Sequence, residues 1–238
     1  FAVRVVFFLE IEAVTRLSVN LNKVALLRNT RDLQIPNVVE AAEVCIAAGA
    51  QGITVHPRPD QRHIKPMDVF SLAGMLTVEF NIEGNPQPDY MQLARRVRPT
   101  QCTLVPDDPG QKTSDHGWDL AKDGPRLKPL IKELKDLGIR VSLFMDADST
   151  GIERARELGA DRIELYTQPY AAAFDQGGVE PVLEVYVQGA QRALKAGLGL
   201  NAGHDLNRAN LGRLLKPIPH IQEVSIGHAL IAAALFLG

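Results

Sequence analysis

Three histidines and two glutamates stand at positions from which their side chains could move protons. His56, His204 and His228 each follow a short apolar segment, whereas Glu83 and Glu164 lie within one. Imidazole is the side chain best matched to proton transfer near neutral pH. A carboxylate in apolar surroundings is costly, so Glu83 and Glu164 are each expected to have a raised pKa or a basic partner. Together the five residues indicate general acid–base chemistry.

Each of these residues also has a structural interpretation. One histidine at a strand end is as often a hydrogen-bonded structural residue as a catalyst, but three at one end favour function. Glu83 or Glu164 could instead form a buried ion pair with an arginine. We interpret His220, which precedes its strand, as structural, and Asp148 as the cap of the helix that follows it.

Glycines late in the chain predict a phosphate site. The pairs Ala202-Gly203 and Gly227-His228 follow two predicted strands, and the second pair leads directly into a predicted helix. Glycine lets a phosphate approach the backbone N–H groups at the start of a helix. A second anion could bind basic side chains in two earlier loops, namely Arg28, Arg31, Arg58 and His63. Two such sites would suit two phosphorylated reactants. Neither His-x-His nor His-Glu-x-x-His spacing occurs, so no catalytic metal is expected.

The elements that must position these residues alternate between short β-branched segments and longer helical ones. The predicted strands are 17–21, 52–56, 79–83, 101–105, 140–145, 162–166, 199–202 and 223–226. The predicted helices are 38–48, 66–76, 90–97, 124–137, 149–158, 179–196, 207–215 and 229–237. Gly49, Gly138 and Gly159 each supply the left-handed residue that ends a helix just before a strand.

Eight strand–helix repeats predict an α/β protein whose residues 15–238 form a single-domain (β/α)8 TIM barrel. An open doubly wound sheet is the alternative, but no GxGxxG motif follows the first strand. The active sites of such barrels lie at the carboxyl ends of the strands. Polar residues gather at those predicted ends, among them Asn20, Asn22, Lys23, His56, Arg58, Glu83, Glu164, His204 and His228.

Composition narrows the range of functions. The 238 residues are 45% hydrophobic and carry 26 Lys and Arg against 28 Asp and Glu, a net charge of −2. Such a chain can bury a large core, and it has no overall positive field to recruit nucleic acid or an anionic membrane. Cys45 and Cys102 lack CxxC spacing, which argues against a disulfide framework and suits a cytoplasmic protein. The longest uncharged apolar stretch, residues 229–237, is about half of what a membrane helix needs.

The sequence resembles the pyridoxine 5′-phosphate synthase family over nearly its whole length. The resemblance rests on TRLSVNLNKVALLRNTR at 15–31, GITVHPRPDQRHI at 52–64, FNIEGN at 80–85, TLVPD at 103–107, VSLFMDAD at 141–148, LNAGHDL at 200–206 and IGHALI at 226–231. It implies a barrel enzyme that condenses 1-deoxy-D-xylulose 5-phosphate with 3-amino-2-oxopropyl phosphate. The products would be pyridoxine 5′-phosphate, inorganic phosphate and water, made without a metal or redox cofactor. It also implies a homo-octamer built as a tetramer of dimers.

The matching motifs imply roles for individual residues. His56 and Glu83 would be general bases, and His204 would be a proton donor. Glu164 would stabilise charge in the transition state. The resemblance assigns the aminoketone phosphate to Asn20, Arg31, Gly227 and His228. It assigns the deoxyxylulose phosphate to Arg58, His63 and Thr113.

Some positions depart from the family pattern. Asn22-Lys23 stands where some members have Asp-His, so contact with the sugar phosphate is expected to change, and Lys23 could balance a phosphate charge. A lysine nucleophile is the alternative, although the family mechanism needs no Schiff base. Asp205 stands where Gly is common and brings a carboxylate to a substrate site, and Tyr166 replaces a His. The last helix is shorter than usual, which suggests truncation, and residues 1–14 are treated as an extension of uncertain role without a signal-peptide pattern.

Two other functions stay open at this point. Another phosphosugar-binding barrel enzyme, of the isomerase or aldolase type, could share the phosphate site, and the Asn22-Lys23 departure supports it. A catalytically silent barrel could bind phosphorylated metabolites. The intact set of His56, Glu83 and His204 argues against a silent barrel.

Overall fold

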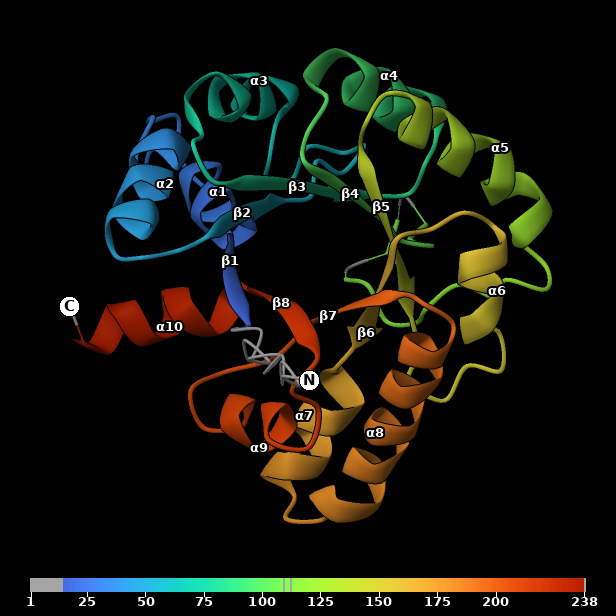
Figure 1. Ribbon diagram of the computed structural model, residues 1–238. Helices are drawn as coiled ribbons and strands as arrows, with labels where there is room; N and C mark the ends of the chain where they lie inside the picture. The colour runs from blue at the N-terminus through green and yellow to red at the C-terminus, as the bar shows by residue number, and fades with distance from the viewer. Residues whose placement is uncertain (1–14, 109, 112, 238) are drawn as a thin grey trace, which may run out of the picture.

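Eight parallel strands close into a barrel in the order β1 to β8, each hydrogen-bonded to its neighbours in sequence and β8 to β1 (Figure 1). The computed structural model describes residues 15–108, 110–111 and 113–237, so the predicted extension 1–14 lies outside the described residues. The strands are β1 Arg16–Asn20, β2 Gly52–Val55, β3 Glu79–Gly84, β4 Gln101–Leu104, β5 Arg140–Met145, β6 Arg162–Tyr166, β7 Gly199–Gly203 and β8 Ile221–Ile226. The predicted (β/α)8 barrel is confirmed.

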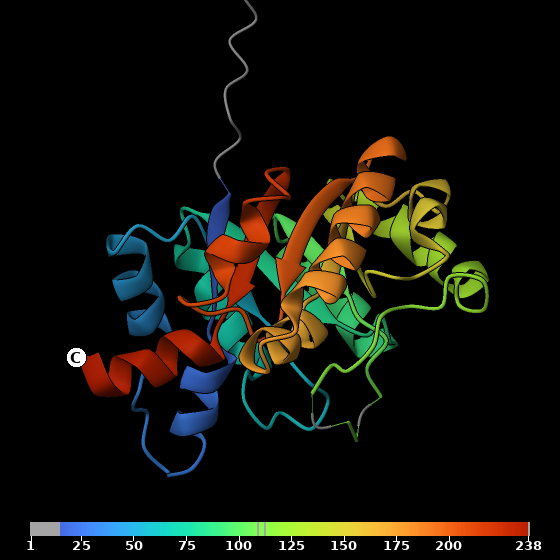
Figure 2. The same ribbon diagram turned by 90° about the horizontal axis from the view of Figure 1, so that it is seen from below.

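The helices surround the barrel (Figures 1 and 2). They are α1 Asn22–Arg28, α2 Val38–Ala47, α3 Pro66–Met75, α4 Pro88–Val97, α5 Gly124–Asp136, α6 Ile152–Glu157, α7 Gln168–Asp175, α8 Val179–Lys195, α9 Leu211–Leu215 and α10 His228–Leu237. Helices α1 and α7 were not predicted, and α9 begins at Leu211 rather than at residue 207. The last helix, α10, packs beside α1, so the two ends of the barrel fold meet across β8 and β1.

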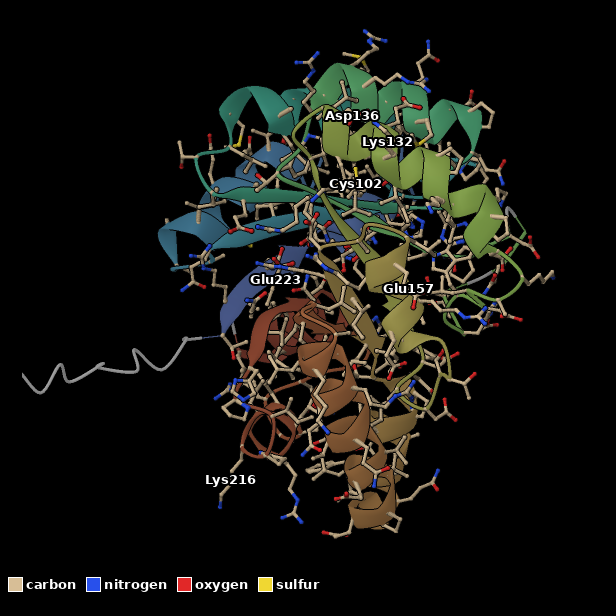
Figure 3. The ribbon with its side chains drawn as sticks, turned by 45° about the vertical axis from the view of Figure 1, so that its right-hand side comes forward. Cys102, Lys132, Asp136, Glu157, Lys216 and Glu223 are labelled. Carbon is tan, nitrogen blue, oxygen red and sulfur yellow. The ribbon has the colours of Figure 1, made fainter. Side chains whose placement is uncertain are left out.

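Local sequence explains where the helices begin and end. Gly49, Gly138 and Gly159 have φ values of +101°, +79° and +98°, and each follows a helix and precedes a strand as predicted. Asn37 caps α2, because its side chain accepts hydrogen bonds from the backbone of Val39 and Glu40. On α5 the charged residues Lys132 and Asp136 point away from the barrel (Figure 3) and lie 2.6 Å apart.

The amino end of the barrel is closed by charged side chains rather than by apolar ones. Glu79 on β3 pairs with Arg16 and Arg140, and Glu223 on β8 lies 3.7 Å from Arg162 (Figure 3). Fully buried leucine, isoleucine and valine side chains fill the layer between strands and helices instead. The charged floor leaves the opposite, carboxyl end as the place where a substrate can enter. Within the described residues, no helix is both long and apolar enough to cross a membrane.

Candidate active site

A cavity of about 580 Å³ opens at the carboxyl ends of the strands. Its walls contain every residue to which the family resemblance assigns a role, except one. The predicted residues that line it are Asn20, Asn22, Lys23, His56, Arg58, His63, Glu83, Thr113, Glu164, His204, Asp205, Gly227 and His228. Strands distant in sequence therefore deliver one polar constellation, because parallel strands all end on the same face of a barrel.

Arg31 is the exception. It lies in the turn after α1, is exposed, and does not line the cavity. The buried arginine of this segment is Arg28, which forms a bidentate ion pair with Asp68 at 2.5 and 2.9 Å and donates to the backbone of His63. Arg28 therefore fixes the second loop to the first, and the position of Arg31 does not support the expected phosphate contact.

His56 and Glu83 form the centre of the site. His56 follows β2, and its Nδ1 lies 3.9 Å from Oε2 of Glu83 on β3. Asn20 donates to the same carboxyl group at 3.4 Å, and Ser225 on β8 donates to its other oxygen at 3.4 Å. The backbone N–H of His56 donates to Oδ1 of Asn22 at 2.9 Å. Asn22, which departs from the family pattern, therefore holds the end of β2 in place.

The environment of this pair changes its protonation. Burial, with a smaller effect of the nearby Asp107 charge, raises the pKa of Glu83 to about 8. Burial and the positive charge of Arg58 hold the pKa of His56 well below 6.5. At neutral pH the site therefore presents a protonated carboxyl group beside a neutral imidazole. The expectation of a raised pKa for Glu83 is confirmed.

Glu164 lies deeper, on β6. It is 3% exposed, and Thr103 on β4 reaches its Oε2 at 3.5 Å. Burial is the main cause that raises the pKa of Glu164 well above 4.5, and the neighbouring Glu83 adds to it. Gly203 makes room for this side chain, because a Cβ atom there would stand 2.4 Å from Glu164 Oε1. A buried carboxyl group that holds its proton can donate a hydrogen bond to charge that develops in a transition state.

His204 lies across the mouth of the cavity from His56 and Glu83. Its Nε2 is 3.0 Å from Oγ1 of Thr113, and its Nδ1 is 3.4 Å from the carboxylate of Asp205. The ring of Tyr166 packs edge-on against the imidazole with 5.1 Å between ring centroids. Thr113 belongs to the loop after β4, so His204 connects this loop to the end of β7. The histidine stands where a substrate between β2 and β7 could receive a proton.

Two groups of residues are suited to bind anions. Gly227 packs against β1, because a Cβ atom there would stand 2.6 Å from the backbone oxygen of Asn20, and α10 begins at the next residue. Arg58 and His63, in the loop after β2, form the second group. The Nδ1 of His63 accepts the N–H of Ile64 at 2.9 Å, and burial lowers the pKa of this histidine to about 4. A neutral His63 therefore keeps its proton on Nε2, where it can donate to an anion.

Sequence reasoning missed Asp107, Ser114 and Ser225. Asp107 follows β4 and contacts Arg58, and Ser114 donates to its carboxylate at 2.8 Å. Asp107 stands in the TLVPD motif just after a predicted strand, so the rule that selected the other strand-end residues could have found it. Among the described residues, no group of three or more His, Cys, Asp or Glu side chains could hold a metal ion.

The family model described as "Pyridoxal phosphate biosynthesis protein PdxJ" matches residues 17–238. The chain belongs to this family. Among PdxJ relatives, the pyridoxine 5′-phosphate synthase of Xanthomonas campestris pv. campestris (strain B100) is 57% identical over 234 residues, which cover 94% of this chain and 91% of that protein. The pyridoxine 5′-phosphate synthase of Albidiferax ferrireducens is 54% identical over 233 residues, covering 94% and 92%. The expected family is confirmed.

Solved structures with a similar fold include two phosphoribosylanthranilate isomerases. Phosphoribosylanthranilate isomerase from Thermotoga maritima superposes with a TM-score of 0.56 at 16% identity, over 92% of this chain and 90% of that one. The corresponding isomerase from Thermus thermophilus gives 0.57 at 13% identity, over 90% and 88%. At this identity the likeness supports the barrel fold and carries no argument about the reaction.

Proposed function

We propose that this PdxJ chain is a pyridoxine 5′-phosphate synthase. It would join 1-deoxy-D-xylulose 5-phosphate to 3-amino-2-oxopropyl phosphate and release inorganic phosphate and water. The observation that carries the proposal is that one cavity is lined by four acid–base side chains together with two groups of residues suited to bind anions. Ring closure by condensation and dehydration needs several proton transfers and no electron transfer.

The acid–base residues divide the proton transfers according to their positions. His56 is neutral and buried, so its free nitrogen can take up a proton during the reaction. Glu83, 3.9 Å away, takes up or returns a proton as the condensation proceeds. His204 donates to a leaving oxygen from the opposite side of the mouth. Glu164 donates a hydrogen bond from below the reacting atoms.

The two phosphates bind to separate groups of residues in this proposal. Asn20, Gly227 and His228 hold the aminoketone phosphate at the start of α10. Arg58, His63 and Thr113 hold the deoxyxylulose phosphate. Lys23 and Asp205 line the mouth, and Lys23 helps to hold the pKa of Asp205 low, although His204 is the larger cause. The exposed position of Arg31 leaves it outside this set.

We also propose that the protein is cytoplasmic and that it assembles into a homo-octamer. Cys45 and Cys102 are both free thiols, which suits the reducing cytoplasm. Exposed large apolar side chains on α1 and α10, Leu27, Leu235 and Phe236, are candidates for burial in a homo-octamer. Sedimentation of the purified protein tests the assembly, with eight times the 26.0 kDa chain mass expected.

The reaction is tested by mixing the purified protein with both phosphates and following the ultraviolet band of the hydroxypyridine product. Reactions that omit either substrate are the controls, and inorganic phosphate should be released in step with the pyridine ring. An isomerase or aldolase would instead convert a single phosphosugar in one of these controls. No product with both substrates present would refute the proposed function.

A further inference from the structure

Asp107 is a buried acid to which the proposed reaction gives no role. Its Oδ2 accepts hydrogen bonds from Arg58 Nη2 at 2.5 Å and from Ser114 Oγ at 2.8 Å. Its Oδ1 is buried and has no hydrogen-bond partner among the described residues. The residue is 5% exposed. A buried carboxylate oxygen without a donor costs free energy, so this position indicates a functional reason for the acid.

His56 lies between two carboxyl groups. Its Nδ1 is 3.9 Å from Glu83, and its Nε2 is 3.9 Å from Oδ2 of Asp107. A neutral imidazole carries one proton, and the groups around the ring decide which nitrogen keeps it. Asp107 forms an ion pair with Arg58, and its negative charge favours a proton on Nε2. The lone pair of Nδ1 then faces Glu83, which is the direction in which the two residues exchange a proton.

Arg58 depends on the same carboxylate. Its second hydrogen bond goes from Nη1 to the backbone oxygen of Gln111 at 3.0 Å. Because the Asp107 carboxylate is the only side chain to which this arginine donates a hydrogen bond within the described residues, it sets where the guanidinium stands in the cavity wall. A guanidinium fixed in advance loses less conformational entropy when it binds a phosphate.

We propose that Asp107 is a positioning residue of the synthase, which fixes the Nε2–H tautomer of His56 and anchors the guanidinium of Arg58. This inference rests on the proposed function. Since one oxygen serves both groups, loss of the carboxylate affects the chemical step and the binding of the sugar phosphate together.

The decisive variant is Asp107→Asn, which keeps the size of the side chain and removes its charge. We expect kcat to fall by about tenfold or more and KM for the deoxyxylulose phosphate to rise several-fold. KM for the aminoketone phosphate should stay unchanged, because its site lies at α10. Asp107→Glu keeps the charge and should restore most of the activity. Asp108→Asn, the same change at the exposed neighbouring residue, is the matched control and should resemble the wild type.

A pH profile separates positioning from a merely structural role. The charged or titratable groups around Glu83 in the described residues include His56, Arg58, Tyr90, Asp107, Glu164 and Glu223. Among the neighbouring charges that raise the pKa of Glu83, that of Asp107 has the largest effect. Its loss should therefore move the acidic limb of the kcat/KM profile toward lower pH. In a His56→Asn background the further effect of Asp107→Asn on kcat should be small, because the two residues act as a unit.

The outcomes are distinct. If the wild type makes no pyridoxine 5′-phosphate, the proposed function and this inference both fall. If the wild type is active and Asp107→Asn resembles Asp108→Asn, only this inference is wrong. Activity lost without a moved pH limb or a selective change in KM also overturns it. Should Asp107→Asn fail to fold, Ser114→Ala loosens the same carboxylate and should raise KM for the deoxyxylulose phosphate, and an unchanged KM contradicts the inference.

Discussion

Glu83 is a carboxyl group that keeps its proton at neutral pH. Burial raises its pKa to about 8, whereas the neighbouring His56 stays neutral because burial lowers its pKa. The pair therefore enters the reaction with its mobile proton on the carboxyl group. A substrate that brings a positively charged amine into the cavity would favour the ionised form of Glu83 and turn it into a base.

The variant Glu83→Gln tests this account. The amide keeps the shape of the side chain but cannot exchange a proton, so kcat should fall by on the order of 10²-fold or more. In the wild type, kcat/KM should rise with pH toward about 8, where Glu83 ionises, and this limb should be absent from the residual activity of the variant. Steady-state product formation between pH 6 and 9 is the measurement. Near-normal turnover would show that Glu83 is not a base.

The departure at Asp205 has a backbone explanation. Asp205 has a φ of +59°, and His204 before it has a φ of +92°. Glycine adopts such angles without strain, and Asp is among the few other residues that tolerate the first of them. The family preference for Gly here therefore reflects the conformation of the chain after β7. Asp205 also places a carboxylate near His204 and His228. These two histidines lower the pKa of Asp205, and His204 has the larger effect.

We expect Asp205→Gly to improve binding of the aminoketone phosphate. The change removes a negative charge near the proposed site at His228, so KM for this substrate should fall. The free energy of unfolding should change by less than about 1 kcal/mol, because the lost contact is half exposed and Gly fits the local φ. Kinetics at saturating deoxyxylulose phosphate and urea unfolding measure the two effects. A raised KM would instead mean that Asp205 supports His204.

At the scale of elements, the long loop after β4 packs closely on β5 at Gly117 and Trp118. The backbone of Gly117 donates to Asp146 at 3.0 Å, and Trp118 donates from its ring to the backbone of Leu104 at 2.8 Å. A Cβ atom on Gly117 would stand 2.3 Å from the backbone nitrogen of Asp146. Only glycine lets the loop approach β5 this closely, and this docking carries Thr113 to His204.

Gly117→Ala should therefore displace the loop and lower kcat/KM by about tenfold or more, since small misplacements of binding groups are costly. Gly110→Ala is the matched control. It lies in the same loop, and a Cβ atom there meets nothing within 4 Å. Kinetic constants of both variants are the measurement. Equal activity of the two would show that the loop can shift without loss of function.

The start of α10 carries a prediction of its own. Ala229 lines the cavity beside Gly227 and His228. Ala229→Asp would place a negative charge at the proposed aminoketone phosphate site, so KM for that substrate should rise by at least about tenfold, with a smaller effect on the deoxyxylulose phosphate. The exposed Ala234, one turn farther along the same helix, provides the control Ala234→Asp. Similar KM values for both variants would place the phosphate elsewhere.

The elements also show what the sequence could and could not predict. Buried β-branched segments identified all eight strands, because a strand covered on both faces reads as a short apolar run. Helix α1 was missed because seven residues directly after β1 look like a loop. Helix α7 is eight residues long, and its only clear signal was Pro169 in the first turn. Short helices such as these are stabilised by packing on the barrel, which their own sequence does not reveal.

At the scale of the whole molecule, closure of the barrel explains the site prediction. A rule about strand ends gathers His56, Glu164 and His204 without any knowledge of distances, since all strands point the same way. The rule does not reach residues in the loops. Arg31 lies five residues beyond Leu26, which lines the cavity, and its direction depends on how the loop packs. The strand-end rule could have selected Asp107, but the role proposed for it rests on its position beside Arg58 and His56.

The buried titratable groups make the stability of the whole barrel depend on pH. Burial lowers the pKa of His56 and His63, so the unfolded chain binds more protons than the fold below their ordinary value of 6.5. Stability from these two groups rises as pH increases to about 6.5 and is then complete. Burial raises the pKa of Glu83, Glu164 and Glu223, so the fold retains protons that the unfolded chain releases above 4.5. Stability from these groups falls as pH rises through their folded pKa values.

Above pH 6.5 only the carboxyl groups still act, so we expect the free energy of unfolding to decrease between pH 6.5 and 8 by more than about 1 kcal/mol. Urea unfolding at a fixed protein concentration measures it, since any assembly would make stability concentration-dependent. Glu83→Gln removes one of the three groups, so its free energy of unfolding should decrease less with pH. The stability of the variant relative to the wild type should therefore be highest at pH 8. A free energy of unfolding that stays level or rises over this range would mean that these carboxyl groups are ionised in the fold. Glu83 would then not be protonated, and the proposed proton exchange with His56 would be wrong.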